Sequence, residues 1–166
     1  MTAPSRRDVR DSIDEFALLE RFLDFQRHSI VRKAQGLERD DATRSFVDSA
    51  TTLLGIVKHL ADVERWWFAA VFAGEQVGFR WTDEDPDADW RIEDDETVEG
   101  IVADYEAACI RSREIVAGRS PLDIAAHEEY RSTTLRWILV HMIEETARHA
   151  GHADILRELT DGVVGE

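Results

Sequence analysis

The stretch from Thr134 to Leu159 reads TLRWILVHMIEETARHAGHADILREL. Its apolar residues recur every three or four positions, which is the spacing of one face of an amphipathic α-helix. Each residue of an α-helix is rotated by about 100° from the one before it. This rotation places four potential metal ligands on one stripe about 80° wide at the edge of the apolar face: His141, Glu145, His149 and His152. The stretch therefore predicts a long helix that carries a row of histidines and a carboxylate beside its buried face.

Three more segments show the same apolar periodicity. They are residues 12–37, 46–73 and 97–117. Four helices with one apolar stripe each bury these stripes best against one another, so the sequence predicts an all-α protein, a four-helix bundle in a single domain of residues 1–166. We expect fewer than about ten residues between the first two helices, which makes them antiparallel neighbours. Residues 74–96 form a longer acidic and aromatic connection.

The charge of the chain excludes several classes of partner. It has 35 acidic and 20 basic side chains, a net charge of -15, which disfavours nucleic acid and anionic membranes. No run of about 20 uncharged apolar residues and no signal-peptide pattern occurs, so we expect a cytoplasmic protein without a membrane partner. The single cysteine, Cys109, rules out an internal disulfide and is expected to be a buried apolar residue.

Angular position narrows the choice among the potential ligands. His149 points furthest into the bundle and Glu145 comes next, at the i, i+4 spacing that places two side chains on adjacent turns. His59 lies at the edge of the apolar face of another helical segment, so it can supply a third ligand across the core. Glu-x-x-His pairs are absent, which favours a mononuclear metal site. The alternative is that these histidines are hydrogen-bonded core or rim residues.

Glu64 falls near the middle of the apolar face of the segment 46–73. A buried carboxylate must be paired or have a raised pKa. One interpretation is an ion pair with a buried arginine such as Arg27. The other gives Glu64 a supporting catalytic role near the metal, in proton transfer or in orienting a ligand, and His141 and His152 are candidates for the same kind of role.

Two stretches resemble the DinB-like superfamily, namely GIVKHLADVERWWF at residues 55–68 and the helix at residues 135–158. They are most similar to its actinobacterial branch, related to mycothiol-dependent maleylpyruvate isomerase. The resemblance implies an up-down-down-up four-helix bundle, often a homodimer. It also implies a divalent metal, usually zinc or nickel, bound by one histidine of the second helix and a pair four residues apart in the last. These positions correspond to His59, Glu145 and His149.

The resemblance implies a metal-dependent transferase or isomerase that uses a low-molecular-weight thiol, mycothiol, and acts on a small electrophilic substrate. The main alternative is a non-enzymatic, metal-binding, stress-related helical-bundle dimer, in which Trp66, Trp67 and Phe68 contribute to the dimer interface. A hydrolase that uses metal-bound water is a third interpretation. It ranks lower because only Glu64 or Glu144 is available as a general base.

Overall fold

The computed structural model describes residues 9–10, 14–49 and 51–165. Its regular elements are α2 (Glu15–Ala34), α3 (Arg39–Ala42), α4 (Leu53–Glu64), the π-helix η1 (Arg65–Phe72), α5 (Val98–Val116), the 3-10 helix η2 (Glu128–Tyr130) and α6 (Leu135–Asp161). The prediction of an all-α protein is confirmed, because these residues form no strand and only an isolated bridge between Ile124 and Thr134. None of these helices is long and apolar enough to cross a membrane.

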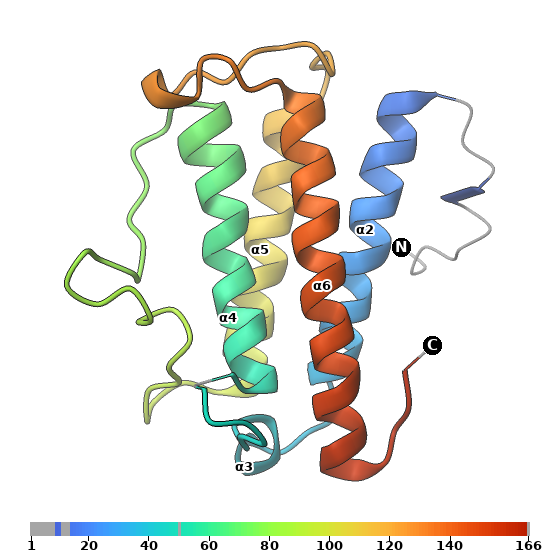
Figure 1. Ribbon diagram of the computed structural model, residues 1–166, viewed down its shortest axis with the longest axis vertical. Coiled ribbons are helices and arrows are strands. Elements are labelled where there is room, and N and C mark those ends of the chain that lie inside the picture. The colour runs from blue at the N-terminus through green and yellow to red at the C-terminus, as the bar shows by residue number, and fades with distance from the viewer. Residues whose placement is uncertain (1–8, 11–13, 50, 166) are drawn as a thin grey trace.

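The long helices α2, α4, α5 and α6 lie side by side, and η1 continues α4 in the same direction (Figure 1). The most extensive contacts join α2 to α6 and α4 to α5. The connection 73–97 runs down the outside of α4, and the connection 117–134 crosses the upper end of the molecule (Figure 1). The apolar faces meet in two buried clusters, one around Tyr105 and Leu54 and the other around Phe68 and Leu139.

Short polar side chains define where the long helices begin. Asp14, Thr52, Thr97 and Thr134 each accept a hydrogen bond from the backbone N–H three residues further on, which is how an N-cap satisfies an unpaired donor. Because Thr52 is the cap, α4 begins at Leu53 and not near Phe46, which is 36% exposed. The prediction that fewer than ten residues join the first two helices is therefore wrong. Residues 35–52 form this connection and include α3.

The predicted helix 46–73 also changes type near its end. Residues Arg65–Phe72 form a π-helix, and the N–H of Ala73 donates to the carbonyl oxygen of Phe68 at 3.0 Å. The connection 117–134 satisfies two further carbonyl groups there, since Ala126 and His127 donate their N–H groups to Phe72 and Val71 at 3.0 Å each. Periodicity predicted a continuous α-helix here. The predicted start of the first helix, at Ser12, lies outside the described residues.

Candidate metal centre

Three side chains from two helices, α4 and α6, converge in one place. One ligand atom from each of His59, Glu145 and His149 lies within 4.8 Å of the other two. Oε1 of Glu145 is 3.6 Å from Nε2 of His59 and 3.1 Å from Nε2 of His149. The structure therefore brings together the three residues that the sequence selected, in a group that could hold a metal ion.

The spacing of these atoms fits a divalent ion such as zinc. Zinc binds imidazole nitrogen and carboxylate oxygen at about 2.0–2.2 Å in tetrahedral geometry, which places neighbouring ligand atoms about 3.3 Å apart. The two measured distances, 3.1 and 3.6 Å, lie on either side of this value. Three protein ligands leave a position for a substrate. The Glu145 side chain is 21% exposed, so the group is reached from solvent.

Asp89 and Trp90, on the connection 73–97, hold the ring of His59. Asp89 is 1% exposed, and its Oδ2 lies 2.6 Å from Nδ1 of His59. This contact holds a proton on Nδ1, so a bound metal would need to displace only the proton of Nε2, which faces Glu145. The ring of Trp90 stacks on His59 at 4.2 Å between centroids. Sequence reasoning missed both residues, and its only signal was the acidic and aromatic composition of the connection.

Several contacts fix this connection against α4. Lys58 Nζ donates to the carbonyl oxygen of Arg91 at 2.6 Å and to Glu96 at 2.7 Å. Arg80 donates to the buried carboxylate of Asp62 at 2.6 Å. A Cβ at Gly55 would lie 2.7 Å from the backbone oxygen of the residue that stacks on His59. Glycine at this position of α4 therefore allows the connection to approach closely enough to reach the histidine.

The electrostatics of the group favour a bound cation. Hydrogen bonds from His149 and His59 hold the pKa of Glu145 far below its usual range, although burial acts in the opposite direction. Burial lowers the pKa of His59, but hydrogen bonds to Asp89 and Glu145 outweigh this effect and raise it. Glu145 is thus ionised and faces both imidazole rings, and a divalent cation between these three side chains would take the place of the protons that they share.

The other two histidines of the α6 stripe lie next to the group and make different contacts. His141 is half-buried and stacks on Trp137, with centroids 5.0 Å apart and planes 16° apart. His152 is exposed, and its ring centroid lies 5.6 Å from that of His149. Both are close enough to act through neighbours, but neither belongs to the cluster of ligand atoms.

Glu64 forms a buried ion pair and does not lie in the group of the three candidate ligands, so its supporting catalytic role stays a prediction. Its carboxylate is 0% exposed and accepts from Nε and Nη2 of Arg27 at 2.8 and 2.6 Å, which confirms the ion-pair interpretation. The reason why it lies outside the group is angular: five residues after His59, at about 100° each, a side chain points about 140° away from it. Burial raises the pKa of Cys109 above its usual range, in agreement with an inert core thiol.

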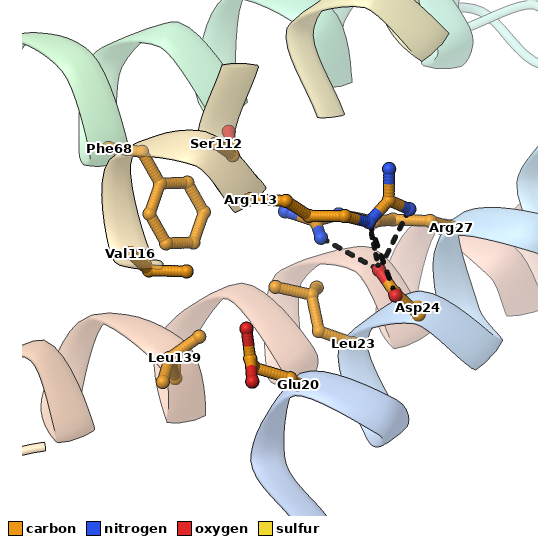
Figure 2. A pocket seen from close by; sticks show the side chains of 9 residues that line it. All are labelled: Glu20, Leu23, Asp24, Arg27, Phe68, Ser112, Arg113, Val116 and Leu139. Carbon is orange, nitrogen blue, oxygen red and sulfur yellow. Dashed lines mark hydrogen bonds and ion pairs between the residues drawn. The ribbon is translucent and has the colours of Figure 1, made fainter. Parts of the chain in front are cut away.

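A small pocket beside Arg27 is also excluded as the reaction site. Figure 2 shows it between α2, α5, η1 and α6, where Asp24 accepts hydrogen bonds from Arg27 and Arg113 at 2.9 and 3.0 Å. Its volume is about 10 Å³, which is the space of a single water molecule. This pocket is therefore too small to admit a substrate, and the group formed by His59, Glu145 and His149 is the candidate for the reaction site.

The chain is thus an all-α protein in which two histidines and one glutamate, from two helices, form a candidate mononuclear metal site. A model of the mycothiol-S-transferase family matches residues 18–162, which includes all three of these side chains. The chain belongs to this family, so the resemblance to a DinB-like, mycothiol-related branch is confirmed. A comparison with curated proteins gives no match, and one with solved structures gives none either.

Proposed function

We propose that the protein is a divalent-metal-dependent enzyme that uses mycothiol, or a similar small thiol, in a transfer or isomerisation reaction on a small electrophile. The observation that carries this proposal is the convergence of His59, Glu145 and His149 inside the segment that the family model matches. Family membership supports the thiol, and two imidazoles with one carboxylate support zinc or nickel as the metal.

A zinc or nickel ion at these three side chains would lower the pKa of a bound thiol and so supply a thiolate near neutral pH. In a transfer reaction the sulfur forms a bond to the electrophilic carbon, and the leaving group departs with the electrons of its own bond. The thiol proton passes to solvent, and we propose His141 and His152 as the residues that relay it. Asp89 keeps the proton of His59 on Nδ1, and Trp90 covers one face of that ring.

The proposal extends to the assembly. The arrangement in Figure 1 supports an up-down-down-up four-helix bundle formed by one domain, and the resemblance to the DinB-like superfamily supports a homodimer. A cytoplasmic location is part of the same proposal, because a reducing compartment suits a thiol co-substrate and a lone buried cysteine. Sedimentation equilibrium measures the dimer directly, and a monomer at all concentrations would contradict it.

The experiment combines metal analysis with calorimetric titration of mycothiol into the purified protein. We expect about one metal ion per chain and thiol binding that disappears when the metal is removed. His59→Ala should lose both, whereas the control His28→Ala should keep both, because His28 lies on α2 and its ring hydrogen-bonds to the backbone oxygen of Asp24 on the same helix. Full metal occupancy in His59→Ala would disprove the site, and a metal-loaded protein that binds no thiol would disprove the reaction.

A further inference from the structure

Three aromatic rings lie together on η1 and α6, and His141 among them precedes Glu145 by about one turn of α6. The ring of Trp67 is 4.7 Å from that of His141 and 5.2 Å from that of Trp137, and the last two rings are stacked at 5.0 Å. We call these three residues the aromatic platform. Neither the ion pairs of the core nor the ligand group accounts for it.

The π-helix explains how Trp67 comes to face Trp137 and His141 on α6. A side chain eight residues after His59 in a continuous α-helix is rotated by about 80° from it. A π-helix, with its i→i+5 hydrogen bonds, turns by about 80° per residue instead of 100°, so three residues of η1 reduce this rotation by about 60°. Trp67 is therefore carried toward the line of His59, on the side where α6 presents His141. π-helical turns are frequent at functional sites.

The platform is both close to the ligand group and open to solvent. His141 precedes Glu145 by four residues, or about 6 Å along the helix axis. Trp137 is 50% exposed and the neighbouring Val140 is 51% exposed. A molecule that lies on these rings would thus have one edge within reach of a sulfur atom held at the three ligands.

Two ion pairs lie beside the platform on α6. Glu144 pairs with Arg148, and Arg136 pairs with Glu15. The platform therefore offers flat apolar ring faces next to charges that are already engaged, and the net charge of -15 disfavours an anion in particular. Offset or edge-to-face stacking between aromatic groups adds about 0.5–1.5 kcal/mol beyond the area that is buried.

We propose that Trp67, Trp137 and His141 bind the electrophilic co-substrate, and that this co-substrate is a neutral, planar, conjugated compound. The inference rests on the proposed function for the identity of the thiol partner. The binding step itself requires neither the thiol nor the metal, which makes it separately testable.

The test titrates 1,3-dinitrobenzene, an unreactive neutral planar compound, into the protein in the presence of EDTA, and again after zinc is added. The readout is the indole N–H resonances in NMR spectra. We expect those of Trp67 and Trp137 to shift and that of Trp81 to stay in place. Trp137→Leu should weaken binding about tenfold without changing zinc affinity. The control Trp81→Leu should bind as the wild type does, because the ring of Trp81 lies against those of Phe79 and Trp66 and not against the platform. The anionic compound 3,5-dinitrobenzoate should bind at least tenfold more weakly.

Unchanged binding in both Trp67→Leu and Trp137→Leu would overturn the proposal, as would equal binding of the anion. A second copy of the chain is the competing occupant of this face. If Trp137→Glu converts a dimer to a monomer and the wild type binds no dinitrobenzene, the platform is an interface and the proposal is wrong. If dinitrobenzene binds as expected but no thiol transfer occurs, the proposed function fails and the aromatic site stands.

Discussion

Replacement of Asp89 tests whether the connection 73–97 is part of the metal site. The carboxylate is 1% exposed and lies 2.6 Å from Nδ1 of His59, a length typical of a charge-assisted hydrogen bond. Such a bond contributes about 1.5–3 kcal/mol. At 1.4 kcal/mol per factor of ten, this corresponds to about a ten- to hundredfold change in metal affinity, which agrees with the usual effect of residues that orient metal-binding histidines.

The two available substitutions should differ in size. Asp89→Asn keeps an oxygen that accepts the Nδ1 proton but loses the charge, so we expect zinc affinity to fall about tenfold. Asp89→Ala removes the acceptor and should cost closer to a hundredfold. The assay is competition for zinc with a chromophoric chelator, and circular dichroism checks that both variants remain helical.

Asp85→Asn is the matched control. Asp85 lies on the same connection and is also ionised and paired, but its partner is Arg91 at the surface and not a metal ligand. We expect its zinc affinity to equal that of the wild type. Zinc affinity of a folded Asp89→Ala within twofold of the wild type would refute the assignment, because His59 would then need no buried acceptor to present its Nε2.

Three further predictions concern stability and the approach of the connection to α4. Glu64→Gln removes the fully buried ion-pair partner of Arg27 and leaves only the partly exposed Asp24 beside it, so the free energy of unfolding measured in urea should fall by up to about 3–5 kcal/mol. A loss below about 1 kcal/mol would contradict the ion-pair interpretation. Burial raises the pKa of Asp104, but hydrogen bonds from two arginines outweigh it and lower that pKa, so its stabilising contribution is complete above the unfolded pKa of about 3.9 and is lost as the pH falls toward the folded value. Asp104→Asn should therefore flatten the decline of unfolding free energy below about pH 5, and an unchanged acid profile would contradict this prediction. Gly55→Ala places a Cβ 2.7 Å from the backbone of the connection, so it should lower both zinc affinity and Tm. Gly151→Ala is the control, because its Cβ would have nothing within 4 Å; it should leave zinc affinity unchanged and add up to about 1 kcal/mol of stability. Equal behaviour of the two variants would show that the close approach of the connection to α4 is unimportant.

The parts of the site that lie on helices could be predicted from the sequence. Helical angles alone placed Glu145 and His149 on the inner edge of α6, and the same argument with the family pattern selected His59 on α4. A residue on a helix has a face that depends only on the position of the apolar stripe. The local pattern is then sufficient to say which side chains of α4 and α6 face one another.

The parts that depend on tertiary contacts could not be predicted in this way. Asp89 reaches His59 because Lys58 and Asp62 hold the connection 73–97 against α4, and no local periodicity encodes these contacts. The π-helix was missed because its apolar pattern over eight residues resembles that of an α-helix. The helix start at Leu53 was missed because Phe46 and Val47 continue the apolar pattern although both are exposed.

X-ray absorption spectroscopy of the zinc-loaded protein, with and without mycothiol, shows whether the thiol sulfur binds the metal. In the absence of the thiol we expect zinc to have only nitrogen and oxygen ligands. After the thiol is added, one sulfur ligand should appear at about 2.3 Å. A spectrum without sulfur at saturating mycothiol, from protein with one zinc per chain, would contradict a thiol activated at His59, Glu145 and His149.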